Sequence, residues 1–109
     1  MEYPIDYGCT VVVGRSRSCD ISLQTLKSWE ALNAEEQSRH KDFKSVSRKH
    51  VRISYYNANS IEVEDLSSNG TFVDGKRVKR IVITDLRNTS HELLLGTQET
   101  FRLEWRSED

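Results

Sequence analysis

The chain has 109 residues, 36% of them hydrophobic and 30% charged, which is typical of one soluble globular domain with a single core. Its net charge of −1 and pI near 6.3 argue against a generic nucleic-acid binder, which needs a strongly basic surface. No apolar run approaches membrane-spanning length, and the N-terminus lacks a signal-peptide pattern, so we expect neither a nucleic-acid nor a membrane partner.

The first half of the chain contains two short extended segments. "TVVVGR" at residues 10–15 is a β-branched run closed by glycine, and "DISL" at residues 20–23 alternates apolar and polar residues. Cys9 and Cys19 have no second pair of cysteines, so they suggest neither a disulfide framework nor a zinc site. We expect each cysteine to be a buried thiol in a protein of a reducing compartment.

Residues 24–44 interrupt this series of strands. The segment is too long for an ordinary connection within a sheet, so we predict an insertion. The spacing of Leu26, Trp29 and Leu32 favours a short helix, with Ser28 as its N-cap. These apolar residues either pin the insertion to the rest of the domain, which is the commoner use of such a face, or form a surface for a partner.

The second half of the chain is a series of short strands. The segments are "VRISYY", "SIEVEDL", "GTFVDGKRV", "RIVITDL", "ELLLG" and "TFRLEW". Asp74-Gly75 is a strong signal for a two-residue hairpin turn between Thr71–Val73 and Val78. Many short strands with glycine and asparagine turns predict one mostly antiparallel all-β domain, a sandwich or a barrel.

Polar residues gather at the ends of two of these strands. Gly14 permits a sharp turn after the first strand, and the guanidinium of Arg15 is the side chain best matched to two oxygens of a phosphate. "SVSRKH" opens a later strand with the hydroxyl of Ser47, the cation of Arg48 and the imidazole of His50, which is placed to brace the loop. These donor groups favour the binding of an anion.

A third polar loop lies in "DLSSNGTF". Asn69-Gly70 suits a tight turn with positive φ, and Ser67 and Ser68 supply hydroxyl groups. The amide of Asn69 offers a donor and an acceptor, which together suit the main chain of a bound peptide. Taken singly, each of these loops is more commonly an ordinary solvated turn.

Together the three loops form the pattern G-R-S, S-x-x-H and S-N-G-T. With "VVVGRSRSCDISL", "SVSRKHVRI" and "VEDLSSNGTFVDGKRV", the sequence resembles the forkhead-associated (FHA) family. The resemblance implies an FHA-type β-sandwich of about eleven strands, with its binding loops at one end. It also implies recognition of phosphothreonine peptides without catalysis, cofactor or metal.

The resemblance also implies a role for each matching residue. Arg15, Ser47, Arg48 and Ser68 correspond to residues that contact the phosphate or its surroundings. Asn69 corresponds to the residue that bonds the peptide main chain beside phosphothreonine. Gly14, His50 and Gly70 correspond to structural members of the site. The family often reads the third residue after phosphothreonine with a loop that would lie near residues 96–99 here.

The resemblance suggests a monomeric domain of a nuclear signalling protein. The implied setting is cell-cycle control or the DNA-damage response, and the related type is the FHA domain associated with checkpoint kinases. The chain departs from the family in its insertion at residues 24–44 and in "DLRNTSHELLLG", which lacks the usual Gly-Asp turn.

Two other functions compete with phosphopeptide binding. A hydrolase would use Ser47, His50 and Asp65, but no G-x-S-x-G motif or oxyanion hole accompanies them. An FHA-like domain could instead bind a partner through a phosphate-independent surface, with the insertion and Trp29 as its candidate. The complete phosphate-binding pattern disfavours that surface as the main one.

Overall fold

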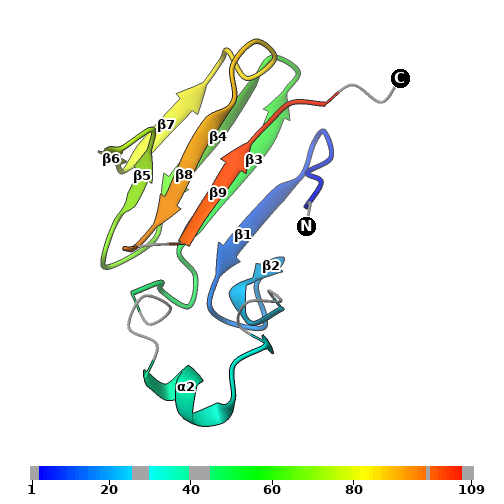
Figure 1. Ribbon diagram of the computed structural model, residues 1–109. Coiled ribbons are helices and arrows are strands. Elements are labelled where there is room, and N and C mark those ends of the chain that lie inside the picture. Colours follow the sequence, from blue (N-terminus) through cyan, green and yellow to red (C-terminus); the bar gives the residue numbers. More distant parts are fainter. Residues whose placement is uncertain (1–2, 26–29, 40–44, 98, 107–109) are drawn as a thin grey trace.

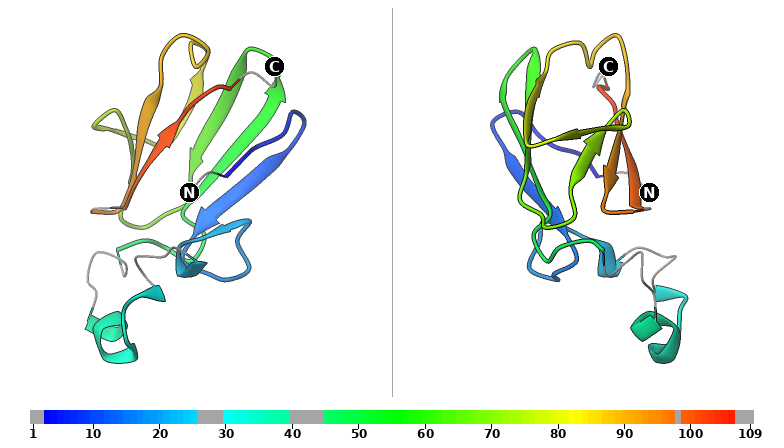
Figure 2. Two further views of the ribbon diagram at one scale, coloured as in Figure 1. Left: turned by 45° about the vertical axis from the view of Figure 1, so that its right-hand side comes forward. Right: turned by 90° about the vertical axis from the view of Figure 1, so that its left-hand side faces the viewer.

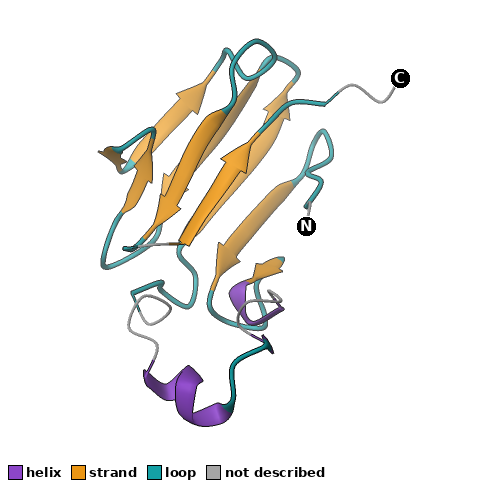
Figure 3. Cartoon of the chain, viewed as in Figure 1, coloured by secondary structure: helices purple, strands orange, loops and turns teal. Residues whose placement is uncertain are grey.

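The computed structural model describes residues 3–25, 30–39, 45–97 and 99–106, which form two β-sheets and little helix (Figure 1; Figure 3). The strand order is β2-β1-β3-β4-β7 in the five-stranded sheet and β6-β5-β8-β9 in the four-stranded sheet. The strands are β1 (Thr10–Gly14), β2 (Ile21–Ser22), β3 (Val51–Asn57), β4 (Ser60–Asp65), β5 (Thr71–Val73), β6 (Lys76–Val78), β7 (Arg80–Ile83), β8 (His91–Leu95) and β9 (Glu99–Leu103).

This arrangement confirms the predicted all-β sandwich. β1 and β2 pair in parallel, whereas the other neighbours pair antiparallel. The described residues form nine strands, against the eleven or so that the family resemblance implies. Each segment predicted to be extended contains one strand, and "GTFVDGKRV" contains two.

The hairpin between β5 and β6 also follows the prediction. Val73 pairs with Lys76, so Asp74 and Gly75 form a two-residue turn. Their φ angles are 51° and 83°, the positive values required by the turn type that matches the twist of a hairpin.

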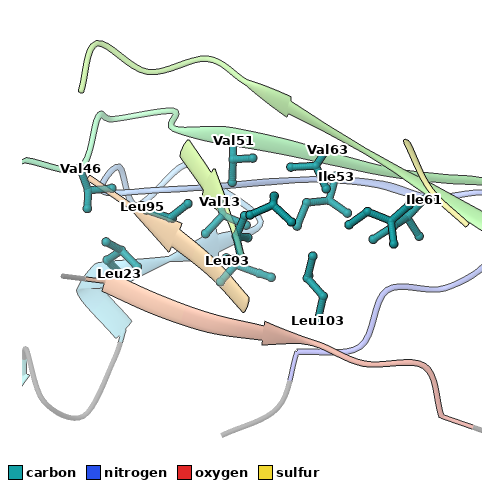
Figure 4. Close-up of a cluster of buried hydrophobic side chains, with 13 residues drawn as sticks. Val13, Leu23, Val46, Val51, Ile53, Ile61, Val63, Leu93, Leu95 and Leu103 are labelled. Carbon is teal, nitrogen blue, oxygen red and sulfur yellow. The ribbon is translucent and has the colours of Figure 1, made fainter. Parts of the chain in front are cut away.

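Alternate strand residues of both sheets form the core, as Figure 4 shows. Register pairs Ile53 with Val63, and both side chains lie between the sheets. Leu93 and Leu95 of β8 face them from the four-stranded sheet. The buried hydrophobic residues are Val13, Ile21, Leu23, Val46, Val51, Ile53, Ile61, Val63, Val73, Ile83, Leu93, Leu95 and Leu103. Full burial of each such side chain favours folding by about 1.5–3 kcal/mol, so the core gives the loops a firm base.

The two cysteines differ in environment. Cys19 is half-buried, its Sγ–H donates to the carbonyl oxygen of Arg48 over 3.0 Å, and burial raises the pKa of its thiol. Cys9 is exposed, so the prediction of a buried thiol is wrong there. Cys9 lies directly before β1, where its N–H donates to the carbonyl oxygen of Asp6 and its own carbonyl oxygen accepts from the Tyr55 N–H, and its side chain is exposed.

Four connections meet at one end of the sandwich. They are the β1–β2 loop, the segment before β3, the β4–β5 loop and the β8–β9 turn, which lie together in each view (Figure 1; Figure 2). β9 leads the chain away from this end, which we call the loop end.

The insertion extends from the loop end and contains a short helix, as predicted, but Leu32 lies before this helix and not within it, as the predicted spacing required (Figure 2). This helix, α2 (Ala34–Arg39), begins after an Asn33 N-cap. Glu36 N–H donates to Asn33 Oδ1 over 2.8 Å, and Asn33 N–H donates to Glu36 Oε1 over 3.1 Å, a reciprocal capping box. Of the apolar residues predicted to pin the insertion, Leu32 is half-buried; Leu26, Trp29 and the predicted N-cap Ser28 lie outside the described residues.

Neither α2 nor any other helix within the described ranges is both long and apolar enough to cross a membrane.

Candidate functional site

His50 connects two of the loops through hydrogen bonds made inside the protein. It is fully buried, and its Nδ1 accepts a hydrogen bond from the Ser47 N–H over 3.0 Å. Nε2 therefore carries the proton and donates to the carbonyl oxygen of Gly70, 2.7 Å away. Burial lowers the pKa of His50, although the bond to Gly70 and the charge of Asp65 oppose the shift. The imidazole is thus a neutral brace between the segment before β3 and the β4–β5 loop.

Asp65 shapes the β4–β5 loop from within. Its Oδ1 accepts hydrogen bonds from the N–H and hydroxyl of Ser67 and from the hydroxyl of Thr71. The hydroxyl oxygen of Ser67 in turn accepts from the Gly70 N–H over 2.8 Å. Burial acts to raise the pKa of Asp65, but these hydrogen bonds outweigh it and leave the pKa lowered.

Asp65 and Ser67 therefore support the loop, a role that the sequence reasoning missed. The Asp-x-Ser spacing is the available signal, because an aspartate commonly accepts from the main chain two residues later. Gly70 at the end of the loop has a φ of 103°, a conformation that favours glycine.

Gly14 allows β1 to end directly against the segment before β3. A Cβ at this position would overlap the carbonyl oxygen of Arg48 and lie 2.8 Å from its carbonyl carbon. The close approach lets the N–H groups of Arg15 and Ser16 donate to the carbonyl oxygens of Ser47 and Arg48, over 3.0 and 3.1 Å. Gly14 thus sets Arg15 beside Ser47.

The remaining predicted site residues lie around Arg15 and Ser47. The Ser68 N–H donates to Ser47 Oγ over 3.2 Å, which joins the second and third loops. Asn69 is exposed, and its Nδ2 donates to the carbonyl oxygen of Ser45 over 2.8 Å. Arg48 is also exposed. The structure therefore brings together residues that are more than fifty positions apart in the sequence.

Arg15 differs from the other arginines whose side chains the structure describes, all of which are exposed. Its side chain is half-buried, and its Nε is buried without a hydrogen-bond partner among the described residues. A buried donor without an acceptor is uncommon in proteins, and this one is available to an acceptor from outside the chain.

A fourth connection closes the site beside Ser45. The hydroxyl groups of Ser45 and Thr97 lie 3.1 Å apart, and the Thr97 N–H donates to Ser45 Oγ over 3.1 Å. The Gly96 N–H donates to the carbonyl oxygen of Gly70, also over 3.1 Å. Sequence reasoning pointed to residues 96–99 but left Ser45 without a role; here it connects two loops.

The geometry does not support a hydrolase. His50 Nδ1 accepts from the main chain of Ser47, and its Nε2 faces Gly70, so neither ring nitrogen serves the Ser47 hydroxyl. The bonds of Asp65 Oδ1 go to Ser67 and Thr71. In a catalytic triad, hydrogen bonds join the nucleophile to the base and the base to an orienting carboxylate, and here those bonds are not formed. Within the described residues, no group of three metal-ligating side chains is placed to hold an ion.

A family model shows which proteins share this arrangement. The model for the FHA domain matches residues 11–96, which include the first three loops and the start of the β8–β9 turn. The chain belongs to the FHA domain family. FHA domains are protein-interaction modules that bind phosphothreonine peptides in signalling. A comparison with curated proteins gave no match.

Solved FHA structures share the fold. The FHA domain of the CT664 protein from Chlamydia trachomatis has 27% identity and a TM-score of 0.66, over 97% of this chain and 86% of that one. The FhaA FHA domain, solved with the intracellular domain of Rv3910, has 22% identity and a TM-score of 0.60, over 92% and 85%. The N-terminal FHA domain of S. cerevisiae Rad53p, solved with a phosphothreonine peptide, has 17% identity and a TM-score of 0.53, over 86% and 64%.

Proposed function

We propose that this FHA domain binds a phosphothreonine-containing segment of a partner protein at its loop end. The observation that carries the proposal is the buried, unpartnered Nε of Arg15. Leaving such a donor without an acceptor costs about 1–3 kcal/mol, more for a charged group. A phosphate oxygen is an acceptor of the right kind, because guanidinium and phosphate form paired, charge-assisted hydrogen bonds.

In this proposal the ligand-binding residues come from three of the four loops. Arg15, Ser47, Arg48 and Ser68 bind the phosphate, which carries roughly −1.5 to −2 charges and three strong acceptor oxygens. Asn69 binds the peptide main chain and exchanges its bond to the carbonyl oxygen of Ser45 for one to the ligand. His50 holds the loops without touching the ligand. Loops held in this way lose little conformational freedom on binding, which favours affinity from a small contact area.

The cellular setting is a further part of the proposal. A role in nuclear signalling, cell-cycle control or the DNA-damage response rests on resemblance to the checkpoint type of FHA domain. Among the similar structures, the Rad53p domain comes from yeast and the CT664 domain from a bacterium. The similar structures thus come from both yeast and bacteria, and the checkpoint setting rests on the sequence resemblance alone.

A binding assay with matched peptides tests the ligand. An oriented phosphothreonine library first selects a sequence, which is then made with threonine, phosphothreonine or phosphoserine at the fixed position. We expect the unphosphorylated peptide to bind about 100-fold more weakly or worse in fluorescence anisotropy, because at least two charge-assisted hydrogen bonds are lost. Equal affinity for the phosphorylated and unphosphorylated peptides would favour a phosphate-independent surface and refute the proposal.

A further inference from the structure

The side chain of Arg17 is held in place next to the proposed phosphate site. Arg17 follows Arg15 by two residues, and its Nε–H donates to Oε1 of Gln24 over 2.8 Å. The Nε2 of the same Gln24 donates to the carbonyl oxygen of Arg15 over 2.9 Å. One amide group therefore links the guanidinium of Arg17 to the main chain of Arg15.

The loop that carries Arg17 is itself anchored to the site. The Ser16 N–H and the Cys19 Sγ–H both donate to the carbonyl oxygen of Arg48. These bonds lie on either side of Arg17 in the sequence. The position of Arg17 is thus fixed relative to the segment that contains Ser47.

Arg17 has no acidic partner in the described part of the chain. Asp20, the acidic residue of the same loop, accepts a hydrogen bond from the Val12 N–H over 2.8 Å. On the sheet surface the pattern is different, because Arg52 and Arg80 form ion pairs with glutamates on β4. Arg17 is an exposed cation that an amide orients and no carboxylate neutralises.

We propose that Arg17 is a specificity-determining residue, which binds an acidic side chain of the ligand within about three residues of the phosphothreonine. The inference rests on the proposed function and names the ligand class more closely: a phosphothreonine segment with a neighbouring negative charge. Gln24 acts as a positioning residue, since it holds Arg17 through Nε.

The geometry supports this assignment. With Nε bonded to Gln24, the Nη groups of Arg17 remain to form a paired contact with two oxygens. The Cα atoms of Arg15 and Arg17 are at most about 7.6 Å apart, and an extended peptide advances about 3.3–3.6 Å per residue. The separation of these Cα atoms therefore corresponds to about two ligand residues, and the length of the two arginine side chains extends the reach to a further residue. A carboxylate and a second phosphate share the required chemistry.

The test compares neutral and acidic neighbours of one phosphothreonine. The starting peptide has alanine at the three positions on each side, and each position in turn is replaced by glutamate or phosphoserine. Dissociation constants are measured by anisotropy for the wild type, Arg17→Gln, Arg17→Lys and Arg106→Gln. The last variant removes the same charge from the end of the chain that β9 carries away from the loops.

We expect at least one glutamate peptide to bind the wild type about three- to fivefold more tightly than the alanine peptide, the range for a favourable exposed ion pair. Phosphoserine at that position should add more, because its charge is larger. Arg17→Gln should remove this preference, Arg17→Lys should keep part of it, and Arg106→Gln should keep all of it. The preference should also shrink in high salt.

Other outcomes overturn the inference. If the alanine peptide binds and no acidic position improves affinity, Arg17 does not read the ligand, while the proposed function stands. A preference that survives in Arg17→Gln assigns the acidic contact to another cation. If no phosphothreonine peptide binds, the proposed function itself fails, and the inference fails with it.

Discussion

Two histidines at opposite ends of the sandwich differ in burial and in the groups to which they bond. His50 lies behind the loop end, fully buried and neutral, between the Ser47 N–H and the carbonyl oxygen of Gly70. His91 begins β8 at the far end, where Nδ1 contacts Asp74 and Nε2 lies 2.7 Å from Asp85. Hydrogen bonds to these two carboxylates raise the pKa of His91, whereas burial lowers that of His50.

The difference extends to the residues around each histidine. At the far end both ring nitrogens of His91 have carboxylate partners within the chain, Asp74 and Asp85. Asp74 also accepts from the Glu92 N–H and so joins the β5–β6 hairpin to β8. At the loop end His50 uses main-chain groups, and the cations in front of it have no carboxylate partners in the described ranges. At the far end the ring nitrogens of His91 are paired with carboxylates of the chain. At the loop end the buried Nε of Arg15 has no acceptor among the described residues. This is the arrangement expected of a site for an anion.

The largest expected effect comes from removing the buried brace. His50→Ala leaves the Ser47 N–H and the carbonyl oxygen of Gly70 without partners and opens a cavity. We expect the free energy of unfolding to fall by about 3–5 kcal/mol, measured by urea denaturation. His91→Ala is the matched control and should cost far less, since its partners stay in contact with water. Equal losses for the two variants would mean that His50 is not the brace that its contacts indicate.

The next effect separates binding from folding. Arg15→Ala should weaken phosphopeptide binding by about 100-fold or more, because the paired hydrogen bonds to the phosphate are lost. The melting temperature should hardly change, since the variant also removes a buried donor that has no partner. Arg52→Ala, which breaks an ion pair with Glu64 on the sheet surface, is the control and should leave binding intact. If Arg15→Ala instead unfolds the protein, Arg15 is structural.

The sequence predicts the sheets well because their signals are local. Alternation in "VRISYY" and "SIEVEDL" identifies β3 and β4, and Asp74-Gly75 identifies the hairpin, since each pattern follows from neighbouring residues. Cys9 was placed in the core wrongly, because cysteine is usually buried and only the fold reveals that this one lies in a turn. The G-R-S, S-x-x-H and S-N-G-T motifs located three loops through family resemblance.

The rest of the site depends on contacts between distant residues. Ser45 and Thr97 are 52 positions apart, and no local pattern indicates that their hydroxyl groups meet. The same holds for the approach of Gly14 to Arg48, which the strand pairing of β1 with β3 creates. Such contacts follow from the register of the folded sheets. Sequence motifs thus identify residues of the site, whereas the register of the strands determines which of them are in contact.

A smaller effect should appear in the pH dependence of stability. The pKa of His91 is raised, so its stabilising contribution is fully present below the unfolded-state value of 6.5 and is lost as the pH rises through the folded-state value. The low pKa of Asp74 keeps its carboxylate charged through most of this range. The pKa of His50 is lowered, so below pH 6.5 it has the opposite effect and favours unfolding.

Comparing His91→Gln with the wild type isolates the effect of His91, because both proteins contain His50. We expect the variant to melt about 2–4 °C below the wild type at pH 6 and within about 1 °C of it at pH 9. Arg102→Gln, which breaks an exposed ion pair with Glu104 that contains no histidine, should shift the melting temperature equally at both pH values. A His91→Gln deficit that stays constant with pH would show that His91 acts through packing and not through its charge.

The smallest effect should come from the insertion. Deleting residues 27–39 and closing the gap with a short glycine-serine linker should change the dissociation constant of a phosphothreonine peptide by no more than about twofold. Between described residues, the hydrogen bonds that hold the four loops run between the β1–β2 region and residues 45–97, and a shorter connection has a slightly lower entropy cost of closure.

The insertion nevertheless extends from the loop end, where a longer ligand would pass, and the side chains described at the start of α2 are exposed or half-buried. A short peptide and one extended by ten residues on each side distinguish the possibilities. If the deletion weakens only the extended peptide, the insertion belongs to the binding surface, and the open end of the sandwich is larger than its four loops.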